Sequence, residues 1–387
     1  MSGYSRRAAS SATFLLCYTF YMLDGLFVRK ANYDRVDSIL KRENFAFTSD
    51  DVTSFLKGNQ KGLRYGNKVL LRNEAGIFQK RFLKIVIDGT YRTYNLFKRQ
   101  VKITEALQED KNFDSRTLAV VRSSVKPPVP YAIFETLDEG DGFGFMHDNL
   151  SFYEKFTEQE MEKLVETMYK FHEAGANVNQ KTIKLARDIP PRLKTYVKEA
   201  DKLLGTRVVH KKKDGSETKE QVGTLIAQYM GITDVKSRVS NAFQQNFVRI
   251  RAMESSNYFL VHADMQIDNV YRHNNGDFEL IDFEWVGRTK NHAVAIMYDY
   301  GNLRARAWSS KRFQLMLDGT MINVGARYKY SPDLVKAGLT LGKLRSSLMM
   351  ARFHLDFTNT VKEDKRTEGQ YYDMYPRTIA TLAEVLK

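Results

Sequence analysis

The stretch VHADMQIDNV, residues 261–270, together with ELIDFEW, residues 279–285, decides how the rest of this chain is interpreted. It combines a His-x-Asp triplet, an Asn five positions after that Asp, and an apolar pair that ends in a second Asp. The intervening residues fit a β-hairpin, because two short apolar runs flank the turn sequence NNGD at 274–277. Such a hairpin would bring Asp282 back to face Asn269.

Acidic and amide side chains in this arrangement are typical of sites that transfer a phosphoryl group from a nucleotide. One carboxylate, here Asp264, would position the attacking hydroxyl, while Asn269 and Asp282 would hold magnesium against the phosphates. Oxygen donors suit magnesium, which keeps part of its shell of water and phosphate. The same residue types also occur by chance, and Asp is common in turns. The apolar strand at 258–261 and the hairpin favour the site interpretation over coincidence.

The segment resembles the catalytic loop and the metal loop of aminoglycoside phosphotransferases and choline kinases, which share the protein-kinase fold. Those enzymes usually carry His-Gly-Asp-x-x-x-x-Asn and Ile-Asp-Phe/Trp-Glu. Here Ala263 replaces the glycine and Asp268 precedes the Asn. The run YDYGNL at 298–303 matches a family helix whose Asp lies beneath the catalytic loop. The specific match covers about forty-five residues, and the wider architecture extends it over most of the chain.

The resemblance implies a role for each of these side chains. Asp264 would act as general base or would orient the hydroxyl, and Asn269 and Asp282 would bind Mg²⁺. His262 would pack and hydrogen-bond within the loop rather than transfer protons. Asp299 would be buried beneath the loop and would accept hydrogen bonds from its backbone.

The amino-terminal part predicts strands followed by one helix, as in the small lobe of this fold. By the resemblance, Lys84 on the strand at 82–86 contacts the nucleotide phosphates; the alternative is a surface lysine on an edge strand. The family places a Glu on the next helix, predicted at 91–109, as the partner of that lysine. The register puts Gln100 there and points Glu105 elsewhere, which leaves the partner of Lys84 open.

The strand at 131–137 resembles the last small-lobe strand and the hinge, where the backbone of Glu135 and Leu137 would bind adenine. A short Gly-bearing loop at 58–62 would cover the phosphates, although its spacing departs from the protein-kinase pattern. The segment 138–144, rich in Gly and acidic residues, marks the boundary between the lobes.

We therefore expect an α+β protein with a bilobal protein-kinase-like fold. A small antiparallel β-sheet lobe with one helix would precede a large, mainly helical lobe. The predicted organisation is an N-terminal extension with helices at 1–50, the nucleotide-binding sheet lobe at 51–138, and a lobe with the catalytic loop and the acceptor-binding helices at 139–387.

Local signals place several elements of the large lobe. A capping box at Thr157–Glu160 begins a helix that ends at Gly175 and carries His172 as a structural rather than a catalytic residue. An exposed hairpin or loop is predicted at 206–223. Further helices are predicted at 224–230, 233–254, 336–361 and 377–387, the last of them starting after Pro376.

Composition favours a globular protein in a reducing environment. Hydrophobic residues make up 43% of the 387 residues and aromatic residues 12%, which is enough for two lobes with cores. Cys17 is the only cysteine, so an internal disulfide and a cysteine-based metal site are excluded. The net charge of +14 would attract anions, but the basic residues are dispersed apart from Lys211–Lys213, so we expect no nucleic-acid partner.

The N-terminus carries Arg6 and Arg7 ahead of an apolar run at 12–23, which resembles the start of a signal peptide. No small-x-small cleavage site follows, Asp24 ends the run, and the run is too short for a clean membrane span. For residues 1–21 we favour a misassigned start codon or a poorly ordered arm over a targeting segment. We expect a cytoplasmic protein without a membrane partner, with membrane association through this run as the alternative.

Together these features predict a phosphotransferase that uses Mg²⁺ and ATP or GTP and acts on a hydroxyl of a small molecule. The acceptor would be an amino sugar, an amino alcohol or a sugar; its identity, the choice of nucleotide and the oligomeric state stay open. The alternatives are a catalytically weak kinase-like binding or regulatory module, a protein kinase, and a metallohydrolase with His262, Asp264, Asp268 and Asp282 as ligands.

Acceptor recognition would fall to side chains that follow the metal loop. Glu284 would contact a second metal or the acceptor, or else would lie exposed after its strand. An aromatic and acidic pocket would suit a cationic amine. Its candidate residues are Trp285, Trp308, His354, Asp356, Phe357, Tyr371, Tyr372 and Tyr375.

Overall fold

A computed structural model describes residues 34, 37–38, 41, 45–46, 64–72, 78–86, 91–111, 113, 119–125, 130–135, 150–212, 214–251, 254–266, 269–273, 275–307, 310–358 and 368–386. The chain divides into two compact units: residues up to Val101 with 118–136, and residues 102–117 with the remainder. The predicted Gly-bearing loop at 58–62, the boundary segment 138–144 and the N-terminal residues 1–21 lie outside the described residues. The protein is of mixed α and β structure, with small, largely antiparallel sheets.

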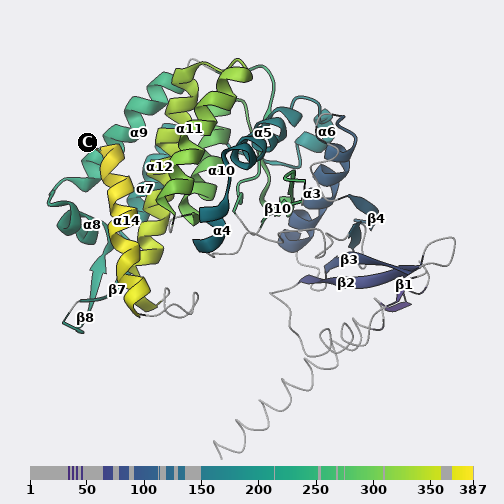
Figure 1. The fold of residues 1–387 in the computed structure, drawn as a ribbon, viewed down its shortest axis with the longest axis horizontal. Helices are drawn as coiled ribbons and strands as arrows, with labels where there is room; N and C mark the ends of the chain where they lie inside the picture. Colours follow the sequence, from purple (N-terminus) through teal and green to yellow (C-terminus); the bar gives the residue numbers. More distant parts are fainter. Residues whose placement is uncertain are drawn as a thin grey trace, which may run out of the picture. The chain divides into compact units, whose positions relative to one another are not determined.

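The first unit contains a five-stranded antiparallel sheet with the strand order β1-β2-β3-β5-β4. Figure 1 labels four of these strands, β1 to β4. Within this sheet β3 lies between β2 and β5, and Lys84 on β3 is paired with Gly66 on one side and Ala132 on the other. The alternative of a lysine on an edge strand is therefore wrong. The strands are β1 Phe45–Ala46, β2 Arg64–Arg72, β3 Phe78–Val86, β4 Val120–Ser124 and β5 Tyr131–Glu135.

The helix α3, Tyr91–Gln108, follows the sheet strand β3 and agrees with the predicted helix to within one residue. Its side chains Phe97 and Val101 form a buried cluster with Val86, Ala132 and Phe134. The helix is amphipathic, as a helix that covers one face of a sheet must be.

The second unit is mainly helical, and its strands occur in pairs or threes. None of the helices described is both long enough and apolar enough to cross a membrane. The helices are α4 Leu150–Lys155, α5 Glu158–Ala174, α6 Gln180–Ile183, α7 Leu193–Leu204, α8 Val222–Met230, α9 Val235–Arg251, η3 Phe283–Trp285, α10 His292–Arg306, α11 Lys311–Arg327, α12 Pro332–Leu355 and α14 Glu368–Leu386. The strands are β6 Arg187–Asp188, β7 Arg207–Lys211, β8 Glu217–Gln221, β9 Phe259–Val261, β10 Val270–Arg272, β11 Phe278–Leu280 and β12 Gly287–Thr289.

Helix α5 begins and ends where the sequence predicts. Thr157 is its N-cap, and the reciprocal hydrogen bonds with Glu160 complete the capping box. A glycine at a helix end usually adopts a left-handed conformation, but Gly175 has an ordinary right-handed φ of −56°. A Cβ at this position would lie 2.6 Å from the Tyr258 carbonyl oxygen, so the glycine lets the chain before β9 approach the helix closely.

Three helix boundaries near the C-terminus differ from the prediction. Helix α12 begins at Pro332, behind the N-cap Ser331, four residues earlier than predicted, and ends at Leu355, six residues before the predicted end at 361. Helix α14 begins at Glu368 and contains Pro376 in its interior, so a helix start after Pro376 is wrong. A proline interrupts one backbone hydrogen bond but tertiary packing can retain the helix around it, and the later part of α14 buries Ile379, Leu382 and Leu386. The hairpin β7–β8 and the helices α8 and α9 lie where the sequence predicts them.

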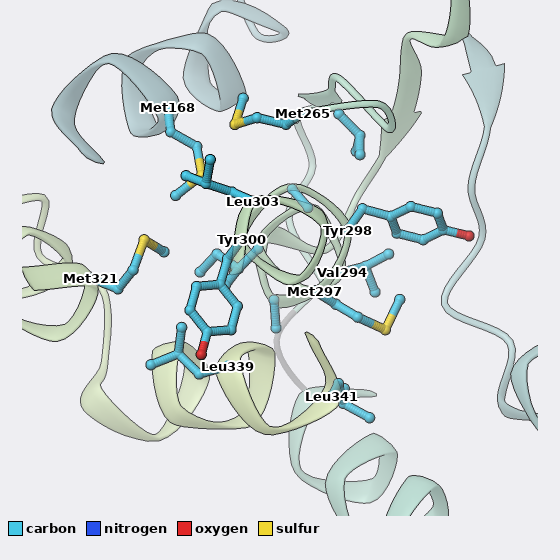
Figure 2. Packing of buried hydrophobic residues seen from close by; sticks show 14 of the residues in the cluster. Met168, Met265, Val294, Met297, Tyr298, Tyr300, Leu303, Met321, Leu339 and Leu341 are labelled. Carbon is cyan, nitrogen blue, oxygen red and sulfur yellow. The ribbon is translucent and has the colours of Figure 1, made fainter. Parts of the chain in front are cut away.

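The core of the second unit surrounds helix α10, which is buried on all sides along most of its length (Figure 2). Met297 and Tyr300 point from this helix into the cluster, which also contains Met168 of α5, Met321 of α11 and Leu341 of α12. A helix that is buried all round is held in a fixed position by its neighbours. Helix α10 can therefore act as a rigid support for residues that contact it.

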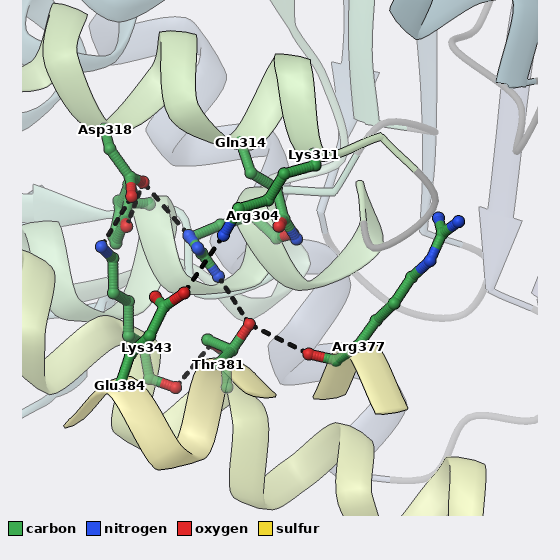
Figure 3. A network of polar contacts seen from close by, with 10 residues as sticks. Arg304, Lys311, Gln314, Asp318, Lys343, Arg377, Thr381 and Glu384 are labelled. Carbon is green, nitrogen blue, oxygen red and sulfur yellow. Dashed lines mark hydrogen bonds and ion pairs between the residues drawn. The ribbon is translucent and has the colours of Figure 1, made fainter. Parts of the chain in front are cut away.

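A polar cluster beside this core ties four helices together (Figure 3). Asp318 on α11 accepts hydrogen bonds from Tyr300 and Arg304 of α10, at 2.6 and 3.1 Å, and forms an ion pair with Lys343 of α12 at 2.6 Å. Arg304 also donates to Thr381 of α14. Because these groups are largely buried, their mutual pairing fixes the relative positions of the helices more firmly than an exposed ion pair would.

The close contact between α10 and α12 yields the first testable prediction. A Cβ on Gly301 would lie 2.8 Å from the carbonyl oxygen of Gly342, and backbone atoms cannot move aside without shifting a helix. We expect Gly301→Ala to lower the free energy of unfolding by about 1–3 kcal/mol, the usual range for overpacking. The matched control is Gly319→Ala on α11, which would meet nothing within 4 Å and should leave stability unchanged or raised. Equal thermal shifts for the two variants would contradict this account of the helix contact.

Candidate active site

The loop after β9 is held between a strand and the buried helix α10. Strand β9 pairs with β12, with Val261 opposite Gly287, and this fixes where the loop begins. The Asp299 side chain on α10 is fully buried. One of its carboxylate oxygens accepts the backbone N–H of His262 and the other that of Ala263, each at 2.9 Å. The structure thus has Asp299 buried under the loop, where it accepts hydrogen bonds from the loop backbone as the family resemblance implied.

A second side chain of α10 holds the opposite edge of the same peptide segment. The Nδ2 group of Asn302 donates to the carbonyl oxygen of Ala263 at 3.0 Å, and its Oδ1 accepts from Arg345 at 3.3 Å. The sequence run at 298–303 contained this residue, yet no role was predicted for it. Asn302 lies three residues after Asp299, and residues three apart share a helix face. This spacing could have indicated that Asn302 also faces the loop.

The Asp264 carboxylate lies at the end of this supported segment. The Nδ2 group of Asn269 donates to the Asp264 backbone oxygen at 2.8 Å and to its carboxylate at 3.1 Å. Gln266 adds a further hydrogen bond to the carboxylate at 3.3 Å. Burial raises the pKa of Asp264; the nearby Asp282 also raises it, while His262, Asn269 and Arg306 act in the opposite direction.

The predicted hairpin is present and returns the chain to the loop. Strands β10 and β11 pair in antiparallel register, and the N–H of Ile281 donates to the carbonyl oxygen of Asn269 at 3.0 Å. Asp282 follows directly, in the left-handed backbone conformation with φ 62°, before the short helix η3. Its charge is close enough to act on the pKa of Asp264. The structure therefore brings Asp264, Asn269 and Asp282 together; the neighbouring Asp268 lies outside the described residues.

His262 links the loop to the hairpin. Its Nε2 lies 2.8 Å from the carbonyl oxygen of Ile281, and because a carbonyl only accepts, this nitrogen carries the proton. The imidazole is buried against Phe171 and Phe283, with ring centroids 5.9 and 5.2 Å away. This position suits a packing and hydrogen-bonding role. It does not suit the metal ligand that the metallohydrolase alternative requires, and the described part of the chain holds no group of three or more His, Cys, Asp or Glu side chains arranged to bind a metal.

The His172 imidazole contacts Asp299 from the other side. Its Nε2 lies 3.0 Å from the Asp299 carboxylate, and its Nδ1 lies 3.1 Å from Nε2 of His292, all within the buried interior. The sequence indicated a structural role for His172 but gave no partner for it. His292 was missed, because nothing in its local pattern distinguishes it from any residue at the start of a helix.

In the first unit, Lys84 and Gln100 are joined as the helix register suggested. The Lys84 Nζ group donates to Oε1 of Gln100 at 2.8 Å, and Gln100 is only 6% exposed. Glu105 instead pairs with Lys102 at 2.6 Å. The N–H of Glu135, at the end of β5, donates to the carbonyl oxygen of Ala119, so this group is already bonded. Leu137 lies outside the described residues.

The predicted acceptor-binding residues do not all face solvent. Glu284 is 3% exposed, so the alternative of an exposed acid after the strand is wrong. His354 is fully buried, with its Nδ1 2.7 Å from the Thr378 hydroxyl, which makes it part of the core. Trp285 is 37% exposed, and Phe357 carries Lys211 Nζ over its ring at 5.2 Å. Trp308 and the side chains of Tyr371, Tyr372 and Tyr375 lie outside the described residues.

Comparison with known proteins gives matches at the level of structure alone. No protein-family model matches the sequence, and no curated protein matches it. Among solved structures the chain is similar to choline kinase LicA from Streptococcus pneumoniae, with a TM-score of 0.41 and 14% identity over 82% of this chain and 89% of that one. It is similar to the GDP complex of aminoglycoside 2'-phosphotransferase-IIIa, with a TM-score of 0.47 and 8% identity; the match covers 86% of this chain and 97% of that one. It is also similar to amicoumacin kinase hAmiN in complex with AMP-PNP, Ca²⁺ and Ami, with a TM-score of 0.47 and 14% identity; the match covers 92% of this chain and 95% of that one.

The support beneath the loop generates the second prediction. Asp299→Ala leaves two backbone donors and the Nε2 group of His172 without their acceptor in the interior. We expect a loss of about 3 kcal/mol of folding free energy, measured by chemical denaturation. Asp188→Ala is the matched control, because Asp188 is 61% exposed and its ion pair with Arg288 spans 3.7 Å; it should cost less than about 1 kcal/mol. An Asp299→Ala protein as stable as the control would refute this role for Asp299.

Proposed function

We propose that this chain is a nucleotide-dependent phosphotransferase that phosphorylates a hydroxyl group of a small molecule. The observation that carries the proposal is the grouping of Asp264, Asn269 and Asp282 on a loop and hairpin whose backbone is fixed by Asp299. Phosphoryl transfer needs little covalent chemistry from the protein, which mainly aligns the reactants and neutralises charge. A preorganised loop with one carboxylate for the hydroxyl and two oxygen ligands for a cation meets both needs.

In the proposed reaction Asp264 accepts the hydroxyl proton of the acceptor. The acceptor oxygen forms a bond to the γ-phosphorus, and the bond from that phosphorus to the bridging oxygen of the nucleotide breaks. The proton moves to the Asp264 carboxylate, and the nucleoside diphosphate leaves. Burial raises the pKa of Asp264, which makes its carboxylate a better proton acceptor than a fully solvated aspartate.

The donor atoms available beside Asp264 fit a magnesium ion. Because Asn269 uses its Nδ2 group towards Asp264, its Oδ1 atom is the one left to face a cation. Together with the Asp282 carboxylate it provides the oxygen ligands that Mg²⁺ prefers while keeping water and phosphate in its shell. When bound, the ion would neutralise charge on the transferring phosphates.

Lys84 is proposed to contact the nucleotide phosphates, with Gln100 orienting it through a neutral hydrogen bond. The acceptor is proposed to be an amino sugar, an amino alcohol or a sugar, and the donor ATP or GTP. The protein is further proposed to have a bilobal kinase-like organisation and to act in the cytoplasm. Because Gln100 occupies the helix position where the family resemblance calls for Glu, a second candidate is a catalytically weak kinase-like module that binds nucleotide.

The experiment that separates the two candidates measures binding and transfer independently. Magnesium with ATP or GTP should raise the melting temperature of the full chain, and labelled nucleotide should transfer its phosphoryl group to a member of a panel of amino alcohols, amino sugars and sugars. Nucleotide binding without transfer to any acceptor would support the binding module. An absence of nucleotide binding would overturn both.

The third prediction concerns the two acidic residues of the site. Asp264→Asn should lower turnover by at least about a hundredfold, the lower range for general-base groups, while nucleotide affinity stays within about threefold. Asp282→Asn should instead weaken binding of the magnesium nucleotide, because it removes a metal ligand. Calorimetry with and without magnesium and steady-state kinetics measure the two effects. Full turnover in Asp264→Asn would show that Asp264 is not the base.

The fourth prediction concerns Gln100. Gln100→Leu removes the acceptor of the Lys84 hydrogen bond and should weaken nucleotide binding by about tenfold, since hydrogen bonds to charged groups contribute roughly 1.5–3 kcal/mol. Gln100→Glu keeps an acceptor and should retain or strengthen binding. Glu105→Gln is the control, because Glu105 pairs with Lys102. Unchanged affinity in both Gln100→Leu and Lys84→Met would remove Lys84 from the proposed nucleotide site.

A further inference from the structure

We propose that His292 is a positioning residue of the candidate active site, which acts through His172 and Asp299 to fix the backbone of the catalytic loop. This inference rests on the proposed function for its kinetic consequence alone; the series of hydrogen bonds stands by itself. The series runs from His292 to His172, from His172 to the Asp299 carboxylate, and from that carboxylate to the N–H groups of His262 and Ala263.

The directions of these hydrogen bonds follow from the Asp299 carboxylate, which can only accept. Asp299 accepts two backbone N–H groups, and a carboxylate that is buried in this way is stabilised by a third donor. His172 supplies it if its proton is on Nε2, 3.0 Å from the carboxylate. Its Nδ1 then bears a lone pair and must receive a donor from Nε2 of His292 at 3.1 Å.

The opposite arrangement is less favourable. If His172 carried protons on both nitrogens, Nε2 of His292 would become an acceptor, and the proton of His292 would move to the Nδ1 atom of His292. The Nδ1 atom of His292 is buried and has no hydrogen-bond partner in the described structure. A buried donor without an acceptor costs more than a buried lone pair without a donor. Burial lowers the pKa of His292 well below its usual value, with a further contribution from His172. The neutral form with the proton on Nε2 satisfies every donor of the pair.

Aromatic rings hold the His292 imidazole in the required orientation. Phe259 stacks on it with a centroid distance of 4.7 Å, and the rings of Tyr330 and Tyr169 lie 4.0 and 5.2 Å away. Two of these rings are themselves anchored: Tyr169 donates to the carbonyl oxygen of Met321, and Tyr330 donates to Glu173. His292 is the first residue of α10, so its backbone is fixed as well. The side chain thus presents Nε2 to His172 in one orientation.

This arrangement gives His292 an effect on a site that it does not touch. Without that donor, the Nδ1 lone pair of His172 is unpaired, and the imidazole loses one of the two hydrogen bonds that fix its orientation. Its Nε2–H is then held less well against Asp299, which weakens the hold of that carboxylate on the loop. A small displacement of the loop misplaces Asp264, and misplacement of a catalytic group by about 1 Å costs on the order of a hundredfold in rate.

The test begins with the unaltered chain, so that it does not depend on any variant folding. Imidazole ¹⁵N resonances report which nitrogen carries the proton. We expect both His172 and His292 to carry it on Nε2 rather than on Nδ1. Finding the His172 proton on Nδ1, or a doubly protonated His172, would overturn the proposal.

Two substitutions then separate hydrogen bonding from packing. His292→Phe keeps an aromatic ring but removes the donor, whereas His292→Gln keeps an N–H near the position of Nε2. In His292→Phe we expect amide exchange in the peptide 259–266 to rise at least about tenfold relative to the rest of the chain, and in His292→Gln to stay within about twofold. Leu382→Ala, a buried position on α14, controls for general destabilisation and should show no such local rise. Equal local exchange in all three variants would mean that His292 only fills space.

Kinetics supply the functional readout. Turnover should fall at least about tenfold in His292→Phe while the KM for nucleotide stays within about twofold, and His292→Gln should recover at least half of the activity. A loss of nucleotide affinity with unchanged turnover would contradict a positioning role. If the unaltered chain transfers no phosphoryl group, the proposed function fails, while the tautomer and exchange measurements still decide the role of His292.

Discussion

A single carboxylate, that of Asp299, governs the geometry of the candidate site. It is fully buried and accepts three donors: the N–H groups of His262 and Ala263 and the imidazole of His172. An isolated buried carboxylate would be strongly destabilising, so its three partners stabilise the folded chain as well as the geometry of the loop. The same groups therefore set the stability of the interior and the position of Asp264. A substitution that weakens these hydrogen bonds lowers the stability and also displaces Asp264.

The carboxylate can impose this geometry only because helix α10 cannot move. Apolar side chains pack around the helix on all sides, and Gly301 and Gly342 allow it to lie against α12 with no room for a methyl group. At its far end, the pairing of Arg304 with Asp318 adds a directional restraint to that packing (Figure 3). Packing alone tolerates small shifts among apolar groups, whereas a buried polar contact is lost when its geometry changes. The combination makes α10 a fixed reference for the loop.

Local patterns allowed much of this to be predicted from the sequence. The hairpin between Asn269 and Asp282 and the capping box of α5 each depend on residues close in sequence. The partner of Lys84 was left open, although the helix register placed Gln100 opposite it. What could not be predicted depends on residues far apart in the chain. His292 gains its role only when α5 and α10 meet, and Pro376 lies inside a helix because tertiary contacts outweigh its local preference to break one. The reason for Gly175 likewise lies in the approach of the segment before β9, which the helix pattern does not contain.

The backbone of the loop shows how these long-range contacts overcome local preference. Ala263 and Asp282 both adopt a left-handed conformation, with φ of 62°. This conformation is unfavourable for an alanine by about 1 kcal/mol or more, which explains why glycine is the usual residue in the loop that this segment resembles. Ala263 nevertheless holds it, because its N–H is bound by Asp299 and its carbonyl oxygen by Asn302, both on α10. The strain is thus offset by two hydrogen bonds from a rigid helix, so the loop has its geometry before any ligand arrives. Preorganisation of this kind is what a site that acts mainly by alignment requires.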